Sequence, residues 1–336
     1  MRKIILKGME KNIDSLIDSI DVLLMKADDD LKDTLDGEGF VKADVAVKSI
    51  DDIEDALTEA LNGHTDDVLK ALVESDSLKE FIDGSWKDIR DMDDLKQAIY
   101  DALHDRLMDM LSESIEGFID AYEPDLLEEH TAEDLLTEPA AQFVESWASK
   151  LAELMHLETD DQIEAILLQA QSDALSVADT SLKISESGIR DPGYRSRRVA
   201  VTEVLRAESY GQLESMRQCP TIEAKEWMHT GGHKNSPREN HVAISGQQKP
   251  VDEPFDLVGR DGTLYHPMVP RDISLPAAES VNCHCIMNRI RSEEAMGMSL
   301  EDRRAMRKKY MDQVNQEWEE NGTAEQLETQ MFGEDR

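Results

Sequence analysis

The sequence predicts an α+β protein with a largely α-helical N-terminal region, a small α+β domain and a helical C-terminal tail. Apolar residues recur at helical spacing through the first half of the chain. From Pro220 to Pro276 the chain instead becomes rich in Pro, Gly, His, Asn and Asp, with short β-prone segments between loops. Charge changes near the same place, since residues 1–180 carry 47 acidic and 15 basic residues whereas residues 183–311 carry 18 and 20. The expected parts are residues 1–188, 189–292 and 293–336.

The N-terminal region is predicted to be a series of amphipathic helices. Its clearest apolar stripe extends from Met92 to Tyr122, about eight turns at ~3.6 residues per turn. An earlier stripe covers residues 9–24. Thr131 and Thr159 each stand three residues before an Asp or Gln, the spacing of a capping box, which predicts a helix start at both. We expect this acidic helical region to work through contacts with other proteins.

Composition excludes several classes of protein. The formal net charge of -37 makes the chain as a whole a poor ligand for nucleic acid phosphates, so any DNA contact must be local. The dense Asp and Glu runs lack the spacing of a calcium-binding loop. No apolar run approaches the ~20 residues of a membrane span, and three cysteines do not suggest a secreted disulfide framework. We expect synthesis in the cytosol and no membrane partner.

The second half carries the strongest chemical signal. All three cysteines and five of the nine histidines lie within the 67 residues from 219 to 285. An amphipathic helix precedes this segment, and Asp261-Gly262 predicts a two-residue hairpin between short strands. The helix is expected to bury Val201, Val204, Tyr210, Leu213 and Met216.

Cys283 and Cys285 are candidate metal ligands. On a strand their side chains point to the same face, because side-chain direction repeats every second residue. With His241 they would supply ligands for tetrahedral zinc, and His233 and His284 are further candidates. The C-x-C spacing is not the usual C-x₂₋₄-C of a zinc knuckle, so the alternative is that both thiols are small buried hydrophobes.

Two catalytic interpretations are weaker. A cysteine nucleophile needs a base beside it and an acidic residue that orients the base. The sequence shows neither an oxyanion-hole signature nor an orienting acid at a recognisable spacing. A metal-dependent nuclease using His229, His233 and His241 would need carboxylates close by in the sequence, and none cluster there.

A further set of residues follows in a distinctive order along the same segment: Thr202, Glu203, Trp227, Arg238, His241, Gly246, Phe255, Pro267, Asn282, Cys283 and Cys285. In this order they resemble the head morphogenesis domain of tailed bacteriophages, found in the Mu F-like minor head proteins. The resemblance covers roughly residues 195–292 and departs from the family pattern at Ser245 and His284.

The resemblance implies a non-enzymatic minor structural protein of the phage head. Such a protein would bind the portal protein, and the major capsid protein or the scaffold, and would lie inside the virion near the portal. It would act in head morphogenesis and in DNA packaging or ejection. The alternatives are a toxin-like metal-dependent hydrolase or nuclease, and a scaffold that is expelled before packaging.

Two groups of basic residues could make local DNA contacts. One precedes the amphipathic helix, and the other lies on a C-terminal helix predicted to begin at Ser299. An equally acceptable interpretation is that both are solvated helix faces. The residues are Arg190, Arg195, Arg197, Arg198, Arg303, Arg304, Arg307, Lys308 and Lys309.

Overall fold

Long amphipathic helices form the N-terminal region, as their apolar stripes predict. The computed structural model describes residues 31–126, 135–186, 192–230 and 238–332. The predicted stripe at residues 9–24 and the predicted helix start at Thr131 lie outside these residues. The helices of the region are α2 (Ala43–Glu74), α3 (Leu78–Asp83), α4 (Ser85–Arg90), α5 (Asp94–Tyr122), the 3-10 helix η1 (Pro124–Leu126), α6 (Glu138–Ser172) and α7 (Val177–Glu186).

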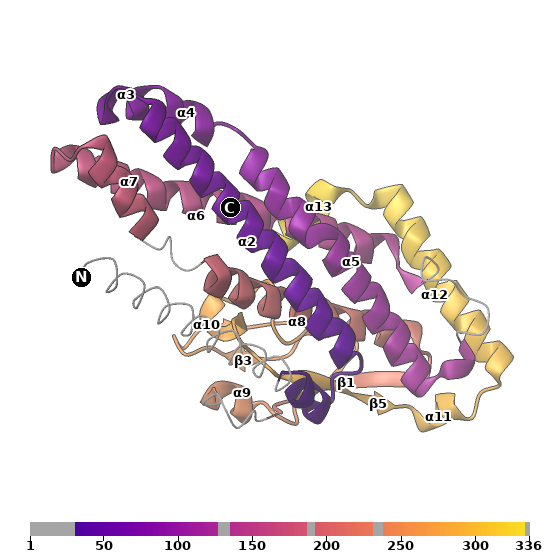
Figure 1. The fold of residues 1–336 in the computed structure, drawn as a ribbon. Helices are drawn as coiled ribbons and strands as arrows, with labels where there is room; N and C mark the ends of the chain where they lie inside the picture. Colours follow the sequence, from indigo (N-terminus) through magenta and orange to yellow (C-terminus); the bar gives the residue numbers. More distant parts are fainter. Residues whose placement is uncertain (1–30, 127–134, 187–191, 231–237, 333–336) are drawn as a thin grey trace, which may run out of the picture.

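Helices α2, α5 and α6 lie along one another and give the molecule its long axis (Figure 1). Their apolar faces meet in one core, in which Ile50, Ile53, Ile99 and Leu103 are fully buried. Each such side chain contributes about 1.5–3 kcal/mol relative to exposure in water. Helices α3, α4 and α7 gather at one end of the bundle, which we call the distal tip, around a second core that includes Phe81.

The helix start predicted at Thr159 is wrong. Helix α6 runs without a break through this residue, which is buried in its middle. The Thr159 hydroxyl donates to the carbonyl of Met155, one turn earlier, at 2.7 Å. Because the Thr159 hydroxyl is already bonded within α6, it does not cap the start of a new helix. No Gly or Pro interrupts the chain nearby.

Helix α8 (Pro192–Gln218) belongs to two cores. In its first half Ala200, Val204 and Leu205 pack in the core of α2, α5 and α6. In its last turns Leu213 and Met216 pack under the sheet that follows. The boundary predicted at residue 188 stays a prediction, but the helix after it is built into both parts.

The α+β portion is small and antiparallel. Strand β1 (Ile222–Met228) lies between β2 (Gln248–Pro250) and β5 (Ile286–Arg291), and β3 (Leu257–Val258) pairs with β4 (Leu264–Tyr265). The predicted hairpin is present, but its two-residue Asp261-Gly262 loop is wrong: residues 259–263 connect Val258 to Leu264, and Gly262 has a φ of +82° whereas Asp261 keeps a negative φ. Two short helices lie between the strands, α9 (Glu239–Ala243) and α10 (Ala277–Ser280), and α11 (Glu293–Met296) follows β5.

The C-terminal tail is helical and returns along the bundle. It consists of α12 (Leu300–Asn321) and α13 (Ala324–Phe332), beside α5 and α6 in Figure 1. The Ser299 hydroxyl accepts from the N–H of Asp302 at 3.1 Å, so the predicted helix start is confirmed. The predicted α+β class with a helical N-terminal region is confirmed as well. None of the described helices is both long and apolar enough to cross a membrane.

Candidate metal centre

The two neighbouring cysteines sit where the chain turns into β5. Asn282, just before them, has a φ of +53°, a left-handed conformation that Asn tolerates better than most residues. This turn lets the N–H of Cys283 bond to the carbonyl of Ser280 at 3.2 Å. Both thiols then face α9 and are 2% exposed.

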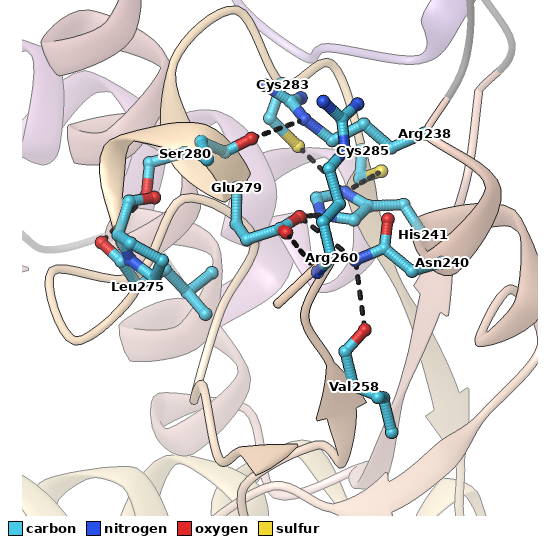
Figure 2. Close-up of polar contacts among 12 residues, drawn as sticks. Arg238, Asn240, His241, Val258, Arg260, Leu275, Glu279, Ser280, Cys283 and Cys285 are labelled. Atoms are coloured by element: carbon cyan, nitrogen blue, oxygen red, sulfur yellow. Dashed lines mark hydrogen bonds and ion pairs between the residues drawn. The ribbon is translucent and has the colours of Figure 1, made fainter. Parts of the chain in front are cut away.

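His241 on α9 completes a close group with the two thiols (Figure 2). Its Nδ1 lies 3.5 Å from the Sγ of Cys283 and 3.5 Å from the Sγ of Cys285. The three ligand atoms all lie within 4.8 Å of one another, and all three residues are buried. The structure therefore brings together the three residues predicted as ligands.

Glu279 on α10 holds the other side of the His241 ring. Its Oε2 lies 3.0 Å from the Nε2 of His241 and accepts from the side chain of Asn240 at 3.0 Å, while Oε1 accepts from the N–H of Arg260 at 2.9 Å. Burial works to raise the pKa of Glu279, but these hydrogen bonds outweigh it and hold the pKa below 4.5. An ionised Glu279 can only accept, so the Nε2–H of His241 donates to it and the Nδ1 lone pair faces the sulfurs.

The two thiols differ in acidity. A hydrogen bond from Cys285 lowers the pKa of Cys283 well below 9.0, and His241 adds to this against the effect of burial. The same contact and burial raise the pKa of Cys285. Cys283 is thus the first of the pair to become a thiolate, the form that binds metal.

The residues shared with the Mu F-like pattern divide into two groups. Trp227 packs edge-on against the rings of His241 and Phe255, at centroid distances of 5.6 and 5.4 Å. Arg238 donates to the carbonyls of Ala278 and Val281, which anchors the loop before the cysteines. Trp227 and Arg238 thus pack around the candidate metal ligands and hold the loop that precedes the cysteines.

The backbone around Trp227 accounts for two further positions of the pattern. Gly246 adopts a φ of +89° and donates its N–H to the Trp227 carbonyl at 2.8 Å. Ser245, which replaces the usual Asp, still offers an oxygen that accepts from the N–H of His229 at 3.0 Å. Pro267 contributes its carbonyl, which accepts from Phe255 at 2.8 Å.

Thr202 and Glu203 lie apart from the metal ligands, on α8. The Glu203 carboxylate accepts from the indole N–H of Trp147 on α6 at 2.6 Å and pairs with Arg206. The Thr202 hydroxyl bonds to the carbonyl of Arg198 within the helix. Glu203 thus links α8 to α6, whereas the Thr202 hydroxyl is satisfied within α8.

The structure places the other candidate histidines differently. His284 turns away from the thiols and its Nδ1 lies 2.8 Å from the carboxylate of Glu38. His229 approaches them instead, with its Nδ1 3.6 Å from the Sγ of Cys285. The register of β1 against β5 explains why His229 and not His284 lies near the thiols. Met228 pairs with Ile286, so one residue further along each chain His229 lies opposite Cys285. His233 lies outside the described residues.

Five of the arginines predicted as local DNA contacts also make contacts within this chain, and their contact with DNA stays a prediction. Arg190 lies outside the described residues, and Lys308 pairs with Asp312. The partners are Thr159 and Glu158 for Arg195, Asp51 and Glu54 for Arg197, Glu123 for Arg303, the Asp125 carbonyl for Arg304, and Gln218 for Arg307.

Sequence reasoning missed the residue that joins the cysteines to α8. Arg271 is fully buried, has a φ of +64°, and donates to the carbonyls of Cys283 at 2.6 Å, Cys285 at 2.9 Å and Leu205 at 2.9 Å. Glu279 was also missed. Neither has a local sequence signal, because an Arg or Glu in a loop is usually exposed.

Comparisons with known proteins agree on the region of this centre. Residues 159–288 match the family described as Phage Mu protein F like protein. A Bacillus subtilis (strain 168) protein named "Uncharacterized protein YqbB" is 30% identical over 307 residues, which cover 89% of this chain and 97% of that protein. No solved structure matches. The family match begins within α6, so it takes in α7 and α8 as well as the metal ligands.

Proposed function

The chain belongs to the Phage Mu protein F like family, and from that premise we propose that it is a minor structural protein of a tailed-phage head. In this proposal it binds the portal protein or the inner surface of the capsid and acts in head morphogenesis. It lies inside the head near the portal and is present when DNA is packaged or ejected. It has no enzymatic activity.

One observation carries the proposal: α8 unites the helical bundle and the α+β portion in continuous cores. Gly211 of α8 approaches Ser114 of α5 so closely that an added Cβ would lie 2.6 Å from the Ser114 Cβ. The hydroxyl of Ser114 donates to the carbonyl of Glu208 across the same contact, at 3.1 Å. Because α8 joins the helical bundle rigidly to the α+β portion, the protein can hold a partner on each part at a fixed distance from the other, as the proposed role in head assembly requires.

The residues of the Mu F-like pattern are engaged in holding the fold. The polar atoms of Arg238 and His241 are taken up by neighbouring loops, and Trp227 and Phe255 are fully buried. Cavities of about 600 and 520 Å³ lie against α2 and α5 and beneath α12 and α13, and none of these pattern residues lines either of them. This arrangement favours a structural role over catalysis.

A narrow apolar stripe on α6 is the surface we propose for portal binding. Leu154, Leu157 and Leu168 are 48%, 45% and 50% exposed. At 100° per residue they fall within about 60° of the helix circumference. Glu158 and Glu164 of α6 flank the stripe and pair with Arg195 and Arg90, so the matching portal surface is apolar at its centre.

Co-purification with the portal protein of the same phage tests this surface. Replacing the three leucines by serine is expected to weaken portal binding at least tenfold, because apolar anchors at an interface centre commonly contribute more than about 1 kcal/mol each. A matched control replaces Val258 and Leu264 of the β3–β4 hairpin, which are 54% and 52% exposed, by serine. Unchanged portal binding by the α6 variant would contradict the proposed surface.

Mass spectrometry of purified virions tests the proposed location. A structural head protein is expected in mature particles at low copy, whereas a scaffold would be absent from them. Incubation of the purified protein with DNA and divalent metals tests the enzymatic alternative. Metal-dependent cleavage that is lost in His241→Ala would overturn the non-enzymatic role.

A further inference from the structure

We propose that His229, His241, Cys283 and Cys285 bind one zinc ion in a closed, structural Cys₂His₂ site. The site joins the end of β1, helix α9 and the segment leading into β5. The inference concerns only the metal, so it stands or falls separately from portal binding.

The spacing of the close group matches tetrahedral zinc. Bonds of about 2.3 Å to sulfur and about 2.0–2.1 Å to nitrogen, at a tetrahedral angle, put a nitrogen about 3.5 Å from each sulfur. His241 Nδ1 lies 3.5 Å from both thiol sulfurs. Three buried ligand atoms therefore already stand at the vertices that the metal requires.

The surroundings of His241 also suit a zinc ligand. Histidines that bind zinc through one ring nitrogen usually donate the other N–H to a carboxylate, which fixes the ring and raises its basicity. Glu279 takes this position at Nε2 and is itself held by Asn240 and Arg260. The Glu279 carboxylate, the His241 ring and the proposed zinc at Nδ1 thus follow the order carboxylate, histidine, zinc that is typical of zinc sites.

His229 supplies the fourth ligand. It follows directly after β1, is half-buried, and has its Nδ1 3.6 Å from the Sγ of Cys285. It does not belong to the group whose atoms all lie within 4.8 Å of one another, so the proposed site needs its ring to move closer to the other ligands when zinc binds. Four protein ligands leave no position for a reactive water, which makes the site structural rather than hydrolytic.

Ligand chemistry selects zinc over harder cations. Two thiolates and two imidazoles are soft and borderline donors, whereas Mg²⁺ and Ca²⁺ take oxygen ligands. Two thiolate charges balance the charge of Zn²⁺, so a buried site stays neutral. Zinc then links segments that lie 54 residues apart in the sequence, His229 and Cys283, and stiffens the wall beside α8.

Metal analysis of the purified full-length protein tests the site. We expect one zinc per chain, released when the protein is denatured in the presence of a colorimetric chelator. His241→Ala, Cys283→Ala and Cys285→Ala are expected to lose the zinc, while His229→Ala, which keeps three ligands, is expected to bind it more weakly than the wild type. His284→Gln is the matched control, since it changes the residue between the cysteines but not a ligand, and it is expected to keep full zinc content.

Cobalt replacement in the wild-type protein keeps the test independent of variant folding. Tetrahedral Co²⁺ with thiolate ligands is expected to give visible absorption bands together with sulfur-to-cobalt charge transfer. No zinc in the wild type after dialysis against a zinc-containing buffer, together with no cobalt bands, would overturn the proposal. Unchanged zinc affinity in a folded His229→Ala protein would overturn its closed, four-ligand form.

Discussion

Replacing Arg271 by methionine tests the idea that this buried guanidinium joins the cysteine segment to α8. Methionine has a similar length and fills most of the vacated volume, so loss of hydrogen bonds dominates over cavity formation. The carbonyls of Cys283 and Cys285 then lose the donor that Arg271 supplies. The Leu205 carbonyl keeps the hydroxyl of Ser209 as a donor, so it is not left alone.

Two orphaned carbonyls at about 1–3 kcal/mol each give an expected loss of about 4 kcal/mol in the free energy of unfolding. This agrees with the about 3–5 kcal/mol found when one partner of a buried ionic network is removed. The neighbouring Glu208 carboxylate, 4.0 Å from Arg271, loses its cation as well. Urea unfolding followed by tryptophan fluorescence measures the difference, since Trp227 is fully buried beside the cysteine segment.

Arg260→Met is the matched control, because Arg260 is exposed and its contact with Glu279 is made by the backbone N–H. We expect this variant to unfold within about 0.5 kcal/mol of the wild type. Arg271→Lys is expected to fall between, because an ammonium can reach one carbonyl but lacks the planar fork. If Arg271→Met unfolded within 1 kcal/mol of the wild type, the reasoning about orphaned carbonyls would be refuted.

Three further predictions concern stability and thiol reactivity. Burial raises the pKa of Glu208 from 4.5 to about 7, so between these pH values the folded state keeps a proton that the unfolded state releases. The free energy of unfolding is therefore expected to fall by at most about 3 kcal/mol as pH rises from 4.5 to about 7. Glu208→Gln is expected to remove this pH dependence in urea unfolding. Gly211→Ala is expected to lower the free energy of unfolding by about 2 kcal/mol, because the new methyl group clashes with Ser114. Gly63→Ala, which has open space around it inside α2, is expected to raise it by about 0.5–1 kcal/mol. Equal shifts of the melting temperature in the two variants would contradict the close approach of α8 and α5. Burial raises the pKa of Cys219 to about 12, so this thiol is expected to react with a disulfide reagent only after denaturation, and rapid labelling of the native protein would show that its surroundings are open.

The sequence was most informative where structure depends on local pattern. Apolar spacing predicted α5, and the Ser299 cap follows from side-chain and backbone preferences within a few residues, as does the positive φ of Gly262, although the loop around Gly262 is longer than predicted. Thr159 shows the limit of such rules, because a capping pattern inside a long apolar stripe does not end a helix when the hydroxyl is satisfied by the turn before it.

The candidate metal ligands illustrate what depends on tertiary structure. Cys283 and Cys285 do share one face, as predicted, but they lie just before β5 and not on a strand; His284 between them points away and meets Glu38. The approach of His229 depends on the register of β1 against β5, which no single-strand pattern contains. Arg271 and Glu279 were beyond prediction, because their partners are backbone groups and rings contributed by distant segments.

Helix α8 gives the molecule the mechanics of a lever. Its 27 residues span about 40 Å, and only three residues separate it from β1. A tilt of about 5° at one end of a stiff helix of that length displaces the other end by about 3.5 Å. Because α8 packs along α2 and α5 and ends three residues before β1, even a small change in its tilt against the bundle would move the strand that leads to His229.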